Sequence, residues 1–251
     1  MDMLIERNGR GMNSASEAEP PDLSWRSLYR VGGAAALITA VLIPIQVVVF
    51  IVWPPPFEGT ATDWFTLFRD NPLVGLLDLD LLLVADNVFL VPIFLALYIL
   101  LRRGSESVMA IATALGFLGI VFFIASNPAF EMLSLSDQYA AATTEGQRST
   151  FLAAGETMIA TWQGTTFQSA YILGSIAGIA IGAVMLRTSI FSNLAGWMAI
   201  LGNAVGLGLY VPTVGVYISV FSVVFLEIWY ILIARRLFQL GQRAPIAEVS
   251  P

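Results

Sequence analysis

The sequence predicts an all-α fold, a polytopic bundle of six transmembrane helices, and three observations support this prediction. Hydrophobic residues make up 57% of the 251 residues and charged residues only 12%, about half the roughly 25% that is typical of soluble domains. Several apolar runs exceed the roughly 18 residues that a membrane-spanning helix needs. The arginines gather in alternate connections between these runs, which is the charge pattern of a multi-pass membrane protein.

The apolar runs define a six-helix transmembrane domain over residues 29–238, between two polar tails. The first tail, residues 1–28, has no apolar stretch long enough for a cleavable signal peptide, and we expect a disordered cytoplasmic segment. Residues 239–251 are predicted to form a short cytoplasmic tail. The six spans are expected at residues 29–53, 73–101, 107–126, 161–186, 190–211 and 214–234.

The second of these spans is longer than a bilayer needs, so it should tilt or protrude. A long connection, residues 127–160, follows the third span and has the pattern of two short helices. Ser136 is expected to cap the first of them, and Thr144 with Gln147 fits a capping box for the second. Two interpretations stay open, a lid over the bundle and an extracellular extension of the fourth span.

The arginines predict the orientation of the chain in the cell (plasma) membrane. All twelve basic residues are arginine, and only Arg69 and Arg148 lie on one side of the predicted membrane. The other side holds Arg7, Arg10, Arg26, Arg30, Arg102, Arg103, Arg187, Arg235, Arg236 and Arg243. By the positive-inside rule this second side is cytoplasmic, which puts both termini in the cytoplasm and both long, acidic connections outside.

The absence of cysteine, histidine and lysine excludes several classes of chemistry. No thiolate or imidazole ligand exists for zinc, copper, haem or iron–sulfur clusters, so we predict no metal and no cofactor. Without lysine no Schiff base can form. The net charge of −6 argues against nucleic acid as a partner. Any internal site must use carboxylates, amides, hydroxyls and arginine.

Asp86 is the most informative of the polar residues in the second predicted span. Counted from Leu101, it lies roughly 22 Å from the cytoplasmic edge, and therefore roughly 8 Å inside the outer edge of the hydrocarbon core. A charge at this depth costs a few kcal/mol, so Asp86 should face protein or water and have a partner. Asp78 and Asp80 lie further out, where we expect solvated or headgroup-level carboxylates.

Polar side chains from four predicted spans reach a similar depth. They predict a water-accessible crevice in the outer half of the bundle. The alternative is that the amides and hydroxyls only join helices by hydrogen bonds. The candidate ligand-binding residues of this polar crevice are Gln46, Asp86, Asn87, Gln168, Tyr171 and Asn203.

Glu227 is a second carboxylate within the membrane. It is expected roughly 9 Å inside the cytoplasmic edge, with Ser192 or Asn193 as a candidate partner. Trp229 and Tyr230 fit an interfacial aromatic belt.

Span four also carries a ladder of small residues at every fourth position, Gly174, Gly178 and Gly182. Small residues at this spacing let a second helix approach closely, so the ladder predicts helix packing and no ligand.

Several segments resemble a known family. They are LYRVGGAAALI, VPIFLALYILLRR, MLSLSDQY, NLAGWMAILG and LEIWYILI, with the glycine-laddered span between the third and fourth. Over most of residues 27–238 the chain is similar to an uncharacterised prokaryotic multi-pass membrane protein family catalogued as a domain of unknown function. The resemblance implies a fold and a topology, and no catalytic residues. Relatives are expected to carry an arginine–tryptophan pair where Ser192 and Asn193 stand here, so no role of that pair transfers.

Three hypotheses about function follow. We favour a ligand- or lipid-binding accessory membrane protein, whose partners are membrane lipids and a small amphipathic ligand; an oligomer is compatible with the sequence. The first alternative is a carboxylate-dependent enzyme on a lipid or isoprenoid substrate, with Asp86 as acid or base and Gln168 or Tyr171 orienting the substrate. The second is a proton- or cation-coupled transporter that uses Asp86 and Glu227, although the chain lacks the internal repeat that many transporters show.

The predicted topology can be tested with reporter fusions. A fusion after Arg243 should be active only with a cytosolic reporter, and a fusion near Glu145 only with a reporter that works outside the membrane. Activity of the same reporter at both positions would contradict the topology.

Overall fold

The computed structural model describes residues 23–242, and every regular element of these residues is helical. The predicted all-α class is therefore confirmed. Residues 1–22 and 243–251, which hold most of the two predicted tails, lie outside the described residues. The α-helices are α1 (Arg26–Val52), α2 (Ala61–Asp70), α3 (Pro72–Asp78), α4 (Leu81–Leu101), α5 (Glu106–Ser126), α6 (Ala129–Ala141), α7 (Glu145–Trp162), α8 (Thr165–Met185), α9 (Asn193–Gly206) and α10 (Gly215–Gln242), with 3₁₀ turns η1 (Leu23–Trp25) and η2 (Leu207–Tyr210).

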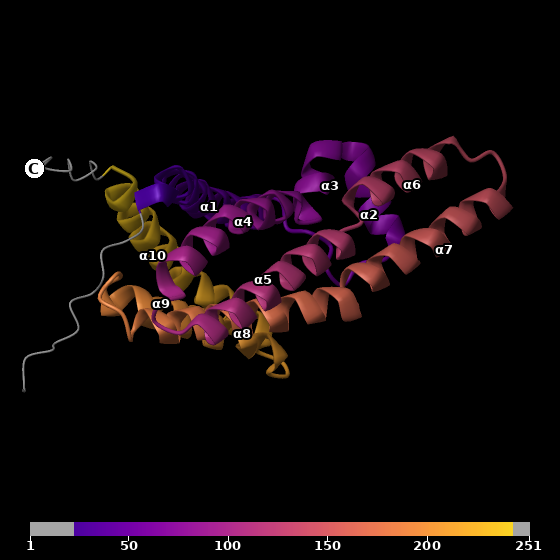
Figure 1. The fold of residues 1–251 in the computed structure, drawn as a ribbon. Helices are drawn as coiled ribbons and strands as arrows, with labels where there is room; N and C mark the ends of the chain where they lie inside the picture. The colour runs from indigo at the N-terminus through magenta and orange to yellow at the C-terminus, as the bar shows by residue number, and fades with distance from the viewer. Residues whose placement is uncertain (1–22, 243–251) are drawn as a thin grey trace, which may run out of the picture.

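Six of these helices form a closed ring through their contacts. Helix α1 contacts α4, α4 contacts α5, α5 contacts α8, α8 contacts α9, α9 contacts α10, and α10 returns to α1. We call these six helices the helical ring. The other four, α2, α3, α6 and α7, lie together beyond one end of it (Figure 1).

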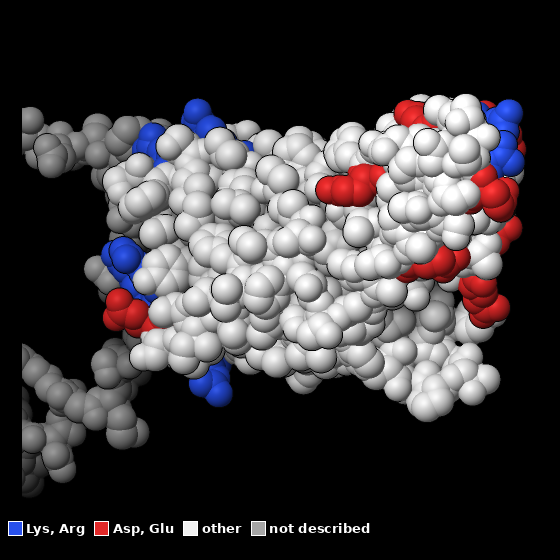
Figure 2. Space-filling model, turned by 90° about the vertical axis from the view of Figure 1, so that its right-hand side faces the viewer, with Lys and Arg blue, Asp and Glu red and all other residues white. Residues whose placement is uncertain are grey.

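The chain is a multi-pass membrane protein by the length and apolarity of its helices. In the described part of the chain five helical segments are long and apolar enough to cross a membrane: α1, α4, α5 with α6, α7 with α8, and α10. Helix α9 has 14 residues, fewer than a single span requires. Figure 2 shows an uncharged belt, with arginines at one end and carboxylates gathered at the other.

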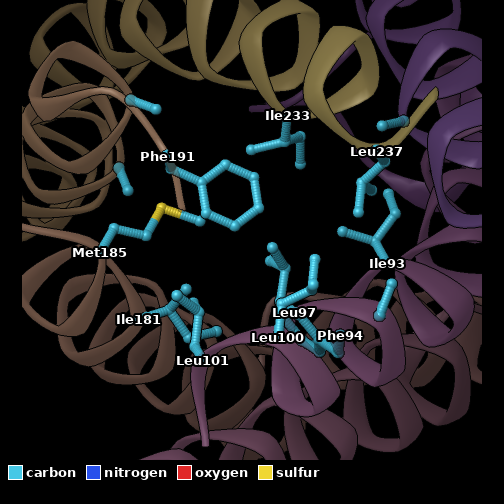
Figure 3. Close-up of a cluster of buried hydrophobic side chains, with 14 of the residues drawn as sticks. Ile93, Phe94, Leu97, Leu100, Leu101, Ile181, Met185, Phe191, Ile233 and Leu237 are labelled. Atoms are coloured by element: carbon cyan, nitrogen blue, oxygen red, sulfur yellow. The ribbon is translucent and has the colours of Figure 1, made fainter. Parts of the chain in front are cut away.

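The two ends of the ring differ in charge and in packing. At the arginine-rich end, where α1 and α5 begin and α4, α8 and α10 end, large apolar side chains fill the interior of the ring (Figure 3). We call this buried cluster the apolar plug. Its members include Ile93, Leu97, Leu101, Ile181, Met185, Phe191, Ile233 and Leu237.

The four helices at the opposite, acidic end share a second hydrophobic core. Its largest members are Trp64, Phe65 and Phe68 of α2, Met132 of α6 and Trp162 of α7, all of them buried. Because this core is separate from the apolar plug, the acidic-end helices form a packed layer of their own. Helices α6 and α7 continue the directions of α5 and α8 (Figure 1), so the segment between spans three and four extends the bundle and also carries α2 and α3.

Three chain breaks separate the acidic-end helices from the ring. The predicted second span is not one helix, because Asp80 adopts a left-handed conformation (φ 63°) between α3 and α4; aspartate is one of the residues that tolerate this region. Pro128 interrupts α5 and α6, and the preceding Asn127 is extended, as expected before proline. Gly164 separates α7 from α8.

Two side-chain hydrogen bonds connect these breaks. Trp162 Nε1 donates to Asp80 Oδ2 over 3.1 Å, and Asn127 Nδ2 donates to the carbonyl oxygen of Leu79. Contacts between segments distant in the sequence therefore fix the junction between the ring and the acidic-end helices.

The two predicted helix caps have different outcomes. Thr144 and Gln147 form the expected capping box, since Gln147 N donates to Thr144 Oγ1 and Thr144 N donates to Gln147 Oε1. Ser136 was expected to begin a helix, and that prediction is wrong: it lies inside α6, buried, where its hydroxyl donates to the carbonyl oxygen of Phe65. It joins α6 to α2.

Asp78 and Asp80 are buried, which corrects the expectation that they are solvated. Asp78 is 0% exposed and neither carboxyl oxygen has a hydrogen-bond partner among the described residues. Burial raises the pKa of Asp78 to about 7. Burial also raises the pKa of Asp80 to about 7, opposed by the hydrogen bond from Trp162 and assisted by the nearby Asp78.

These shifts predict that stability falls as the pH rises from about 4 to about 7. In this window the folded protein retains protons on Asp78 and Asp80 that the unfolded chain releases, so deprotonation favours unfolding, by on the order of 1.4 kcal/mol per pKa unit. Thermal unfolding of the detergent-solubilised protein should therefore show a lower Tm at about pH 8 than at about pH 5. Asp78→Asn and Asp80→Asn should reduce this dependence, whereas the exposed Asp137→Asn should keep it. An identical pH dependence in all four proteins would contradict the assignment.

Candidate functional site: a polar cavity in the helical ring

The helical ring encloses a cavity of about 430 Å³ in the half nearer the acidic end. All six ring helices contribute to its wall, α1, α4 and α5 on one side and α8, α9 and α10 on the other. Most lining residues come from the acidic-end halves of these helices, and the apolar plug fills most of the other half. Four residues of the plug cluster also form the floor of the cavity: Phe94, Ile120, Trp229 and Tyr230. The cavity is partly open. Large side chains of the apolar plug close it toward the arginine-rich end.

Five of the six predicted crevice residues line this one cavity. They come from four different helices: Gln46 from α1, Asp86 and Asn87 from α4, Tyr171 from α8 and Asn203 from α9. The exception is Gln168, which does not line the cavity.

Gln168 is instead engaged at the end of the ring. Its Oε1 accepts a hydrogen bond of 2.7 Å from the hydroxyl of Tyr210 in η2, and its Nε2 donates to the carbonyl oxygen of Gln163.

Most amides and hydroxyls of the wall are hydrogen-bonded to protein. The hydroxyl of Tyr171 donates to the carbonyl oxygen of Gly206 (3.0 Å) and lies 2.6 Å from Ser219 Oγ. It therefore joins α8 to the end of α9 and to α10. Asn87 and Asn203 donate to carbonyl oxygens four residues earlier in their own helices. These contacts are the helix-joining and helix-internal bonds that membrane helices commonly use.

Gln46 connects the cavity to the acidic-end helices. Its Nε2 donates over 3.0 Å to the carbonyl oxygen of Leu77 in α3, while its Oε1 is buried without a hydrogen-bond partner.

Asp86 differs from these groups because it is a buried carboxyl group and no cationic side chain belongs to the described cavity lining. The residue is 6% exposed, and its Oδ1 has no hydrogen bond among the described residues. The side-chain hydroxyl of Thr39 in α1 interacts with the Asp86 carboxyl group and offsets part of the cost of burying its charge. A buried carboxyl oxygen without a donor carries its full desolvation cost. A ligand that donates a hydrogen bond to Asp86 would reduce that cost.

Glu227 lies closer to Asp86 than the sequence indicated. Helix α10 continues to Gln242, so Glu227 falls near its middle rather than close to its end. It interacts electrostatically with Asp86, and both interact with Tyr230. The predicted partner is wrong for Ser192, whose hydroxyl accepts from Ala195 N and caps α9. The two membrane carboxylates therefore belong to one cluster.

Trp229 and Tyr230 also differ from their prediction as an interfacial belt. Their side chains are only 3% and 6% exposed, they lie inside the ring, and both line the cavity. Tyr230 follows Glu227 by three residues and so shares a helix face with it. That spacing is the sequence signal that could have found Tyr230.

The glycine ladder of α8 divides between packing and cavity. A Cβ at Gly178 would overlap the side chain of Asn203, and one at Gly182 would lie 2.8 Å from the carbonyl oxygen of Gly196. These two glycines therefore permit the close contact of α8 with α9, as predicted. Gly174 has no atom within 4 Å of its Cβ position and lines the cavity, so its missing side chain contributes open space.

A row of aromatic rings leads from the cavity wall to the acidic-end helices. Phe50 lines the cavity and meets Phe57 edge to face, with ring centroids 5.6 Å apart. Phe57 stacks on Trp162 at 6.1 Å, and Trp162 meets Trp64 at 5.6 Å. Trp162 is also the donor to Asp80, so the cavity wall and the buried acidic-end carboxylates share a continuous set of contacts.

Sequence reasoning missed several hydroxyls of the site. Ser219 and Ser222 of α10 line the cavity, and Thr39 of α1 lies near Asp86. Isolated serine and threonine residues are common in membrane helices as hydrogen-bonding groups, so their sequence positions carry no distinguishing signal.

The chemistry available in the cavity is binding by shape, apolar contact and a few polar groups. No group of three or more potential metal-ligating side chains occurs within residues 23–242. An apolar wall with a small number of placed polar groups is the usual character of a small-molecule site, and the volume falls in the common range of about 300–1,000 Å³.

Comparison with known proteins adds no further evidence: no family model matches the chain, and no curated protein or solved structure matches it significantly. The family resemblance drawn from the sequence therefore stays a prediction.

The cavity predicts selective access to Asp86 in a chain with no natural cysteine. Asp86→Cys should react with a small, membrane-impermeant thiol reagent added at the acidic end, because the cavity is partly open. Ile93→Cys, on the same helix α4 but about two turns further along in the buried apolar plug, should stay unmodified. Mass spectrometry of the intact, folded variants measures the modification. An unreactive Asp86→Cys would show that the cavity is closed to water.

Proposed function

We propose that this protein is a six-span protein of the plasma membrane, with both termini in the cytoplasm, that binds a small amphipathic or lipid-like ligand in the cavity of its helical ring. The observation that carries the proposal is the cavity of about 430 Å³, which polar side chains from five helices line within an otherwise apolar wall.

The closed ring supports α9 as a sixth span. Alone, α9 is short, but η2 follows it directly. Together they measure about 29 Å at the usual rise per residue, close to a hydrocarbon core of about 30 Å. An even number of spans returns the chain to its starting side. This agrees with the arginines found both before the first ring helix and at the end of the last one, on the same side of the predicted membrane.

A binding role is favoured over an enzyme on a lipid substrate. The residues expected to orient a substrate beside Asp86 were Gln168 and Tyr171. Gln168 lies outside the cavity, and the hydroxyl of Tyr171 is already bonded to Gly206 and close to Ser219. Neither of these two residues is therefore free to share acid–base work with Asp86.

A coupled transporter is the second candidate, and one observation favours it. Asp86 and Glu227 lie within electrostatic range of each other in the interior of the ring, and proton relays in membranes use such carboxylates. The apolar plug at the arginine-rich end would have to open during transport, because it closes the path beyond Glu227. Binding alone requires no such movement.

Filling the cavity tests the proposed function. Gly174→Leu should place a side chain into open space, with no clash at Cβ, and should displace small molecules that co-purify with the wild-type protein. The expected loss is about tenfold or more in their amount by mass spectrometry, with Tm held or raised because leucine favours helix over glycine.

Gly146→Leu in α7 is the matched control, because its Cβ position also meets no atom within 4 Å but does not line the cavity. Equal amounts of every co-purified molecule in wild type, Gly174→Leu and Gly146→Leu would overturn the proposal.

A further inference from the structure

We propose that the ligand of this cavity is a lipophilic amine, a molecule with one positively charged nitrogen on an apolar body, and that its charge pairs with Asp86. This inference rests on the proposed binding function and specifies its ligand class.

The charges of the site all have one sign. The ionisable side chains that line the cavity are Asp86, Tyr171 and Tyr230, and the partly buried Glu227 lies within electrostatic range of Asp86. No arginine belongs to the lining within residues 23–242, and the chain has no lysine or histidine. The protein therefore supplies acids to this space and no cation to balance them.

A cationic ligand would reduce the free-energy cost of burying the Asp86 carboxylate. Its carboxyl oxygen Oδ1 is buried without a donor, and a lone ionised carboxylate in a low-dielectric interior is costly. An ammonium group donates charge-assisted hydrogen bonds, which are shorter and stronger than those between neutral groups. An anionic ligand would instead be repelled by Asp86 and Glu227.

The rest of the wall fits the other parts of such a molecule. Aromatic rings of Phe50, Phe123, Trp229 and Tyr230 line the cavity, and the faces of such rings attract cations. Aliphatic side chains, among them Ile43, provide apolar contact for a hydrocarbon body. Val220, which is exposed on the outside of α10, also belongs to the lining, so the cavity reaches the surface of the bundle where an amphiphile resides.

A matched pair of probes isolates the charge. Dodecylamine and dodecan-1-ol have the same chain and differ only in an ammonium or a hydroxyl group at neutral pH. Their binding to the full-length protein in phosphatidylcholine nanodiscs is measured by equilibrium dialysis of radiolabelled compound, with binding to empty nanodiscs subtracted. Wild type should bind the amine about tenfold or more tightly than the alcohol.

Variants locate the effect. Asp86→Asn should abolish the preference, so that the amine binds no more tightly than the alcohol. Its Tm should hold, because no arginine of the described lining is left unpaired. Asp137→Asn, the same change at an exposed site of α6, should keep the full preference. Gly174→Leu should weaken both compounds.

The outcomes separate the inference from the function on which it rests. Equal binding of amine and alcohol to wild type, with both lost in Gly174→Leu, would overturn the lipophilic amine and leave the binding cavity standing. A preference for the amine that survives Asp86→Asn would also overturn it. Binding of neither compound to wild type above the level of Gly174→Leu would overturn the proposed binding function itself.

Discussion

The hydrocarbon core of a membrane solvates neither a peptide group nor a carboxylate, and the architecture of this protein depends on that constraint. Backbone groups are satisfied inside helices, so every regular element of the described chain is helical. The arginines stay near one end of the ring. Of the two carboxylates on the apolar helices, Asp86 is buried inside the ring, and Glu227 is partly buried and within electrostatic range of it. A ring, rather than a compact bundle, gives them an interior to face.

The interior is filled differently at its two ends because of side-chain size. Phe191, Met185 and their neighbours close the arginine-rich half, whereas Gly174, Gly206 and small hydroxyl residues leave space in the other half. Gly178 and Gly182 allow α8 to approach α9, whereas Gly174, the first glycine of the same ladder, opens onto the cavity. Packing and binding space are alternative uses of one missing side chain.

The acidic-end helices extend the same principle beyond the ring. Chain breaks at Asp80, Pro128 and Gly164 lie where helices leave the bundle, and the bonds from Trp162 to Asp80 and from Asn127 to Leu79 connect them. The aromatic row from Phe50 to Trp64 joins this level to the cavity wall. Burial of Asp78 and Asp80 at this junction means that protonation there bears on the attachment of the acidic-end layer, which lies over the open half of the ring.

The sequence by itself determined the helical class, the positions of α1, α5 and α10 to within a few residues at their first turns, and the capping box at Thr144. These features depend on transfer of apolar side chains to lipid and on bonds within one turn, so neighbouring residues decide them. It also identified five cavity residues, because depth along a helix can be counted. Tertiary structure alone decided helix rotation and the contacts between helices. Gln168 turns to Tyr210, 42 positions away, Ser136 to Phe65, and Trp162 to Asp80, 82 positions away. Glu227 lies within electrostatic range of Asp86 because α10 and α4 both pack against α1 in the ring. Such contacts arise only when distant segments pack together, and no periodicity within a single segment encodes them.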